Sequence, residues 1–242
     1  MVEILCPRYE LFRILDAVNN IANEAKIVIT NNTLKTRVIN QTHVIALIAE
    51  MSVITEEPNN LEIGLTNIHS IVKFLKSVKT ENVMLKIDKE SGQLHIITET
   101  KNFTCDITDP EFIFSYYTSK IDTNSYAEFS TKGKVLKDLV KYIKPVSNIV
   151  TLESKNWLLR AIASNDEPYD NLRAKTSNNK VSVEIKLGIL RKDVKVSYNI
   201  KYLELIAKSL KKNDSITLKF DTNKPLVVHV NSPTIMFYLA PF

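Results

Sequence analysis

The chain has 242 residues, of which 44% are hydrophobic and 24% are charged, and its formal net charge at pH 7 is +5. This length suits two domains of roughly 100–150 residues each. The composition is that of a soluble protein, and the longest apolar runs, such as residues 44–49, are too short to span a bilayer. Residues 1–15 carry Glu3, Arg8 and Glu10, so they do not read as a secretory signal peptide.

Four segments have the periodicity of amphipathic helices, in which apolar residues recur every three or four positions. They cover residues 11–21, 68–78, 135–143 and 203–210. Each segment is followed by short alternating or apolar runs that are typical of strands. These runs are residues 26–30, 33–39 and 44–51, then 82–88, 93–99 and 103–107, then 149–152, 157–163 and 172–176, and finally 215–220, 226–230 and 235–239. The same order of helix, strands, helix and strands therefore occurs twice, which predicts an internal repeat.

The repeat predicts an N-terminal domain over residues 1–115 and a C-terminal domain over residues 126–242. Between them, residues 116–125 are predicted to be an interdomain connector. Strands joined by short turns favour antiparallel sheets. Helices gathered on one face of such sheets give an α+β fold. Two units of this kind would place four helices side by side, with their polar faces forming one surface.

The predicted polar faces of the helices are basic. The cations at helical spacing are Arg13 on the first helix, Lys73 and Lys76 on the second, Lys134, Lys137, Lys141 and Lys144 on the third, and Lys201, Lys208 and Lys212 on the fourth. Acidic residues on these stripes are few, chiefly Asp16, Asp138 and Glu204. A single lysine-rich helix is commonly just a solvated face. Like charges at helical spacing repel by roughly 0.2–0.5 kcal/mol per pair, so four basic helices favour an anionic partner such as a phosphate backbone.

The residue types on these faces favour duplex DNA that is contacted without sequence preference. Binding of single strands needs exposed aromatic side chains for stacking, and base readout needs Arg, Asn or Gln. The stripes consist almost entirely of lysine, which suits exchangeable contacts with phosphates.

Motifs for catalysis or for cofactor binding are not found in the sequence. It has no phosphate loop and no dinucleotide fingerprint, and its four histidines are scattered. Cys6 and Cys105 are isolated, which fits a reducing compartment and gives neither a disulfide framework nor a zinc site. We therefore predict no catalytic residues, no metal and no cofactor, and thus a protein that is not an enzyme. A nuclease would need clustered carboxylates for its metal ions.

Several stretches of the chain resemble the PCNA family of DNA sliding clamps. They are residues 11–25, 41–47, 64–76, 225–228 and 238–241. The similarity runs along essentially the whole chain and is weakest in the connector and in residues 165–177. The resemblance implies a homotrimeric ring of head-to-tail subunits, lined by helices with the sheets outside. Such a ring encircles duplex DNA as a processivity factor and tethers DNA polymerase and other replication and repair enzymes, after a clamp loader has placed it on DNA.

The resemblance also implies roles for particular residues. The DNA-facing residues would be Arg13, Lys73, Lys76, Lys137, Lys141, Lys144, Lys201, Lys208 and Lys212. A pocket for partner peptides would be formed by His43, Val44, Pro225, Tyr238, Ala240 and Pro241. The subunit interface would be formed by Phe103, Cys105 and Ile107 on one subunit and by Leu172, Arg173 and Lys175 on the next.

The chain departs from this family in its charge. Family members are usually acidic, and the usual acidic stretch before the fourth helix is largely replaced here by basic residues, namely Lys175, Lys180, Lys186, Arg191, Lys192 and Lys195. Two alternatives therefore stand beside the homotrimeric clamp. One is a monomeric DNA-binding processivity factor of the viral type, and the other is one subunit of a heterotrimeric clamp. In each case we expect an intracellular protein, nuclear in a eukaryote and cytoplasmic in an archaeon or a virus.

Overall fold

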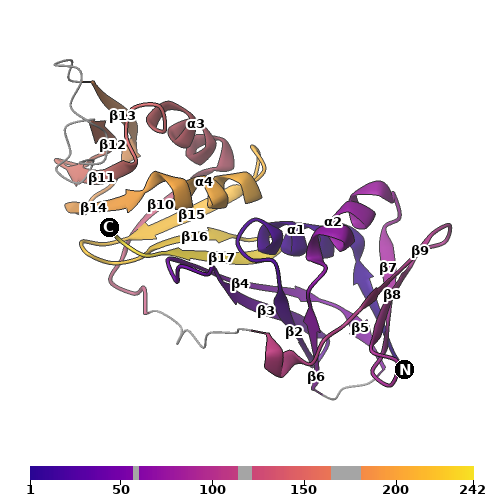
Figure 1. The fold of residues 1–242 in the computed structure, drawn as a ribbon. Helices are drawn as coiled ribbons and strands as arrows, with labels where there is room; N and C mark the ends of the chain where they lie inside the picture. The colour runs from indigo at the N-terminus through magenta and orange to yellow at the C-terminus, as the bar shows by residue number, and fades with distance from the viewer. Residues whose placement is uncertain (57–59, 114–121, 165–180) are drawn as a thin grey trace, which may run out of the picture. The chain divides into compact units, whose positions relative to one another are not determined.

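The computed structural model describes residues 1–56, 60–113, 122–164 and 181–242, which are drawn as ribbon in Figure 1. The chain divides into two compact units. The first comprises Met1–Ser119 with Asn231–Met236, and the second comprises Lys120–Val230 with Phe237–Phe242. Most of the predicted connector, residues 116–125, lies outside the described residues, so the domain boundaries predicted around it stay a prediction.

The first unit contains two helices, α1 (Arg8–Asn19) and α2 (Ile68–Ser77). One of its antiparallel sheets has the strand order β5-β1-β7-β8-β9, and a second group of strands has the order β4-β3-β2-β6. The strands are β1 (Val2–Pro7), β2 (Ala25–Thr30), β3 (Thr33–Ile39), β4 (Ile45–Ser52), β5 (Ile54–Thr55), β6 (Leu61–Leu65), β7 (Asn82–Asp88), β8 (Gln93–Ile97) and β9 (Asn102–Asp106). A short 3₁₀ turn, η1 (Pro110–Phe112), follows β9.

The second unit repeats this arrangement with helices α3 (Gly133–Ile143) and α4 (Ile200–Ser209). One group of strands has the order β13-β12-β11-β14, and another has the order β10-β15-β16-β17. The first three residues of β17 are counted with the first unit and its last three with the second. The strands are β10 (Ala127–Lys132), β11 (Ile149–Lys155), β12 (Leu158–Ser164), β13 (Ser182–Ile189), β14 (Val194–Asn199), β15 (Ser215–Phe220), β16 (Leu226–Val230) and β17 (Thr234–Leu239).

The two units follow the same chain path, so the predicted α+β repeat is confirmed. In each unit a strand leads into a helix, four strands follow, a second helix comes next, and three further strands complete the pattern. The first unit has one additional strand between its helices, the two-residue β5. By this correspondence β13 occupies in its sheet the place that β4 occupies in the first unit. Strands β1, β5, β6, β10, β13 and β14 lie where the sequence analysis predicted none. The predicted strand over residues 172–176 lies outside the described residues.

The core of the first unit lies where the apolar faces of α1 and α2 meet the sheets. Leu11, Leu15 and Ile71 from the helices contact a small interior space that is also lined by strand residues such as Ile27 and Leu85. All of the apolar residues that the periodicity placed on the inner faces of α1 and α2 are buried. Burial of each large side chain contributes about 1.5–3 kcal/mol, so these faces fix which side of each helix remains polar. None of the helices within the described ranges has the length and the apolar run that crossing a membrane requires.

Candidate nucleic-acid interface

The turn after α4 holds the start of α3. The Gly133 amide donates to the Asp214 carbonyl over 2.8 Å, and the Lys134 amide donates to the Lys212 carbonyl over 2.9 Å. These bonds satisfy two first-turn donors that have no acceptor within α3. A Cβ at position 133 would collide with the Lys211 carbonyl oxygen. Glycine at this position therefore lets α3 dock closely against the end of α4.

The facing sides of α3 and α4 form an open groove of about 560 Å³. We call it the α3–α4 groove, and it is lined by Lys137, Val140, Lys141, Lys144, Pro145, Glu204, Ala207 and Lys208. Four of these side chains are positive and one is negative. A concave surface with this excess of positive charge attracts anions. The structure thus brings together four of the lysines that the sequence predicted to face DNA.

Three of the four groove lysines are already bound to acceptors within the protein. Glu204 accepts from Lys144 through its Oε2 at 2.8 Å and from Lys208 through its Oε1 at 3.2 Å. The ammonium of Lys137 donates to the Ala207 carbonyl over 2.5 Å. The hydrogen bond from Lys144, helped by Lys208, lowers the pKa of Glu204 below its ordinary value. Glu204 is therefore a charged carboxylate at neutral pH. Its double ion pair was not predicted from the sequence.

The other predicted DNA-facing lysines also point to solvent. Lys201 and Lys212 in the second unit are exposed, as are Lys73 and Lys76 on α2 in the first unit. Among the described residues, neither Lys73 nor Lys76 makes an ion pair. Each unit therefore presents exposed lysines on its helices, as the periodicity predicted. That these lysines contact DNA stays a prediction.

The structure does not support a DNA-facing role for Arg13. This side chain is 2% exposed, and its guanidinium donates to the Tyr9 hydroxyl over 3.5 Å. Arg13 lies one helical turn before Ala17, which is also fully buried. The buried surface of α1 is thus wider than the apolar stripe read from the sequence, and it includes the face to which Arg13 was assigned.

The residues predicted to bind partner peptides come from both compact units. His43 is exposed in a turn with positive φ, and the Val44 amide beside it donates to Asn40 Oδ1 over 2.9 Å. In the second unit Tyr238 is buried, Pro225 and Ala240 are half-buried, and Pro241 is exposed. The amide of Phe242 donates to the Ser197 carbonyl over 2.9 Å, which ties the last residues of the chain to β14. A pocket that joins these residues stays a prediction.

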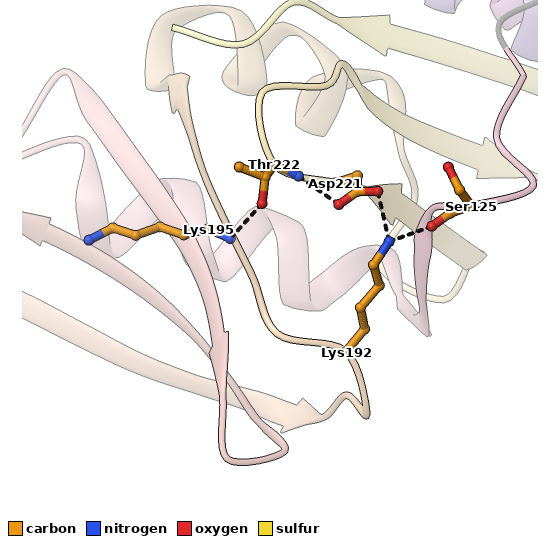
Figure 2. Close-up of polar contacts among 5 residues, drawn as sticks. All are labelled: Ser125, Lys192, Lys195, Asp221 and Thr222. Carbon is orange, nitrogen blue, oxygen red and sulfur yellow. Dashed lines mark hydrogen bonds and ion pairs between the residues drawn. The ribbon is translucent and has the colours of Figure 1, made fainter.

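A lysine from the basic stretch before α4 holds the turn that precedes Pro225. The Lys192 ammonium donates to the Asp221 carboxylate over 2.7 Å and to the Ser125 carbonyl over 2.5 Å, and Figure 2 shows these contacts as dashed lines. Asp221 also accepts from the Thr222 amide at 2.8 Å. The hydrogen bond from Lys192 lowers the pKa of Asp221. Sequence reasoning counted Lys192 only as part of a basic surface, whereas the structure uses it to join three segments of the second unit.

The predicted subunit interface is described on one side only. Phe103 and Cys105 lie on β9, an edge strand of its sheet, and Ile107 follows this strand. Phe103 stacks on Phe74 of α2, and Cys105 is buried. The opposing residues Leu172, Arg173 and Lys175 lie outside the described residues. In the second unit the described edge strand next to β12 is β13.

The described residues contain no group of His, Cys, Asp and Glu side chains arranged to hold a metal ion. Both cysteines are free thiols, and burial raises the pKa of Cys6 to about 12 and that of Cys105 to about 11. They are therefore protonated at neutral pH and poor nucleophiles. The chemistry displayed by the site is that of a cationic surface.

The two repeated units, each with a helix pair on antiparallel sheets, form an α+β fold of the DNA clamp type. The fold matches that of PCNA from A. fulgidus, solved with the C-terminal region of FEN-1, with a TM-score of 0.82 and 17% identity over 100% of this chain and 98% of that one. It matches PCNA from Thermococcus kodakaraensis with a TM-score of 0.79 and 16% identity over all of both chains.

Sequence similarity also extends along the full length of the chain. The chain is 24% identical to the DNA polymerase sliding clamp of Pyrococcus furiosus, with 96% of this chain and 94% of that protein covered. It is 23% identical to the corresponding clamp of Methanocella arvoryzae, over 94% of this chain and 92% of that protein. No family model matches the chain. In sequence and in fold the chain is similar to the PCNA-type sliding clamps, so the resemblance predicted from its sequence is confirmed.

Proposed function

We propose that this protein is a DNA sliding clamp, a processivity factor that encircles duplex DNA and tethers replication and repair enzymes to it. The observation that carries the proposal is the repeated unit, whose helices present exposed lysines in both halves of the chain. Lysines at this spacing suit phosphates, and phosphate contacts hold DNA without reading its sequence. The similarity to two archaeal sliding clamps over more than nine-tenths of the chain supports the same function.

A ring requires self-association, and we assign it to the edge strands β9 and β13. Val183, Ile185 and Leu187 of β13 are half-exposed, whereas Ile45, Leu47 and Ala49 of the corresponding strand β4 are buried. Among the described strands β13 pairs only with β12, and an apolar row on a strand edge without a partner is a site for pairing with another chain. Pairing β13 of one subunit with β9 of the next is a heterologous contact, and such contacts close into rings. Three subunits are expected.

The remaining parts of the proposal concern partners and chemistry. DNA polymerase and other clamp-binding proteins would insert peptides at His43, Val44, Pro225 and Tyr238–Pro241, and a clamp loader would open the ring. The solved structure of A. fulgidus PCNA with the C-terminal region of FEN-1 supports peptide binding by a clamp of this fold. The protein would perform no catalysis and need no cofactor. Its two free thiols agree with an intracellular location.

Retention on circular DNA tests the function directly. A clamp loader of the archaeal type would be used to load the labelled protein onto a nicked plasmid, and the protein that co-elutes with DNA would be measured before and after the plasmid is cut. A topologically linked ring stays on the circle at high salt and slides off the linear product. Salt-sensitive binding that is equal on both DNAs would refute the ring.

The net charge of +5 favours one alternative, a monomer that binds DNA by charge alone. Sedimentation at micromolar concentration separates the two proposals. A ring gives a mass about three times that of the 27.6 kDa chain, and a monomer gives the mass of one chain with a steep salt dependence on linear DNA. A monomer that trimerises when related chains are added would identify one subunit of a heterotrimeric clamp.

A further inference from the structure

We propose that Glu204 acts as an internal competitor for the lysines of the α3–α4 groove and keeps their contacts with DNA weak and exchangeable. This inference rests on the proposed function, because it concerns how strongly the same surface holds a phosphate backbone. It assigns a regulating role to an acidic residue within a site whose other charged residues are all cations.

The position of Glu204 suits this role. Its side chain is 22% exposed, whereas those of Lys144 and Lys208 are each 56% exposed. The carboxylate therefore lies deeper in the groove than the two ammonium groups that it binds. Each of its oxygens serves a different lysine, Oε2 for Lys144 and Oε1 for Lys208. A single carboxylate thus forms ion pairs with two of the four groove lysines.

The ion pairs are of a kind that a phosphate can displace. Pairs between solvent-exposed lysines and carboxylates are weak because water screens them, so either ammonium can leave Glu204 for a phosphate oxygen. The carboxylate stays behind, however, because its backbone is fixed on α4. Once its lysines have turned away, its negative charge faces the incoming phosphate and repels it. The free energy of phosphate binding in the groove is therefore less favourable than the number of its lysines implies.

Lys137, the third groove lysine with an acceptor in the protein, differs from Lys144 and Lys208 in the charge of that acceptor. Lys137 is held by the Ala207 carbonyl, which is neutral. A phosphate that takes Lys137 from this carbonyl leaves a neutral group behind, whereas one that takes Lys144 or Lys208 leaves the carboxylate of Glu204. The competition assigned to Glu204 therefore acts on Lys144 and Lys208. A clamp that is held on DNA by its closed ring needs no tight contact, and this competition would keep the groove free to exchange phosphates during movement.

The test compares Glu204→Gln with Glu153→Gln, which removes the same charge from an ion pair with Lys195 between β11 and β14. Binding to a linear duplex of roughly 30 bp, about three helical turns, would be measured by fluorescence anisotropy from about 50 to 200 mM salt. Glutamine keeps the size and shape of glutamate. The Glu204 variant is expected to bind about three- to tenfold more tightly at low salt. The slope of its log affinity against log salt concentration should be more negative by about one to two. The control should match the wild type.

A second comparison checks that the effect passes through the two lysines. In a Lys144→Gln, Lys208→Gln background, the Glu204→Gln change should alter affinity less than twofold, because the groups for which the carboxylate competes are gone. If the Glu204 and Glu153 variants bind equally, or if the gain persists without the lysines, the competition is refuted while the clamp function stands. If wild type and variants all fail to bind duplex at low salt, both the inference and the proposed contact with DNA are refuted.

Discussion

The close docking of α3 against the turn after α4 gives a prediction in which two principles disagree in sign. Gly133 begins α3, and alanine favours helices over glycine by roughly 0.8–1 kcal/mol. Helix propensity alone therefore predicts that Gly133→Ala stabilises the protein. The structure predicts the opposite, because the new Cβ would collide with the Lys211 carbonyl oxygen, a backbone atom that cannot rotate away.

The magnitude follows from what must move. Overpacking a close contact costs about 1–3 kcal/mol. Moving the turn also weakens the bonds from Gly133 to Asp214 at 2.8 Å and from Lys134 to Lys212 at 2.9 Å, each worth about 1 kcal/mol. After the propensity gain is subtracted, the net loss is about 2–4 kcal/mol. For a protein of this size, that loss lowers the melting temperature by roughly 5–15 °C.

Differential scanning calorimetry of the purified protein measures this loss. Lys134→Ala is the matched control, because it shortens the neighbouring exposed side chain and keeps the amide that donates to Lys212. The control should melt within about 2 °C of the wild type, as expected for an exposed surface position. If Gly133→Ala melted at or above the wild-type temperature, the close approach of α3 to the turn would be wrong, and with it the geometry given for the α3–α4 groove.

Three further predictions follow from single contacts. Lys192→Met should lower the free energy of unfolding by about 1–3 kcal/mol, as measured by urea denaturation, because it leaves the Asp221 carboxylate without its charged donor. The control Lys186→Met, on exposed β13, should leave the free energy of unfolding unchanged. The pKa of Asp221 is held below its ordinary value of 3.8, so its stabilising effect is complete above that value and is lost as pH falls through the lower folded value. The stability advantage of wild type over Asp221→Asn in urea titrations should therefore begin to shrink as pH falls below about 4 and disappear only below the lowered pKa of the folded state. Arg13→Met should reduce stability and leave unchanged the slope of log affinity for duplex DNA against log salt concentration. Lys141→Gln should reduce the magnitude of this slope by about one and leave the melting temperature unchanged.

The sequence was sufficient to predict the four helices and the basic faces of α2, α3 and α4. Both follow from a period of three to four residues, and the inner positions of α1 and α2 are all buried as predicted. The strands that directly follow the helices, such as β2 and β3, were also found, because local alternation marks them. β1 and β10 were missed. Their partners β7 and β15 lie about 80 residues along the chain, and no local signal records such pairings.

The chemistry of the site was less accessible from sequence. Helical spacing places Arg13 opposite Leu11, but it does not reveal that the opposite face is covered as well. The contacts of Lys144 with Glu204 and of Lys192 with Asp221 join residues 60 and 29 positions apart. A charge pattern read along the chain counts these lysines as part of a uniform basic surface, because it contains no information about which carboxylates fold back onto them.

The two units therefore differ in how much of the positive charge on their helices is available to an anionic ligand. A phosphate that meets Lys73 or Lys76 displaces no carboxylate among the described residues, whereas one that enters the α3–α4 groove must compete with Glu204. The salt dependence of binding reports the phosphates that are neutralised when counterions are released, so a lysine already neutralised by a carboxylate adds little to it. The proposed affinity of this surface for DNA would consequently be set by the lysines that lack an internal anion, and a count of the lysines on the helices overstates it.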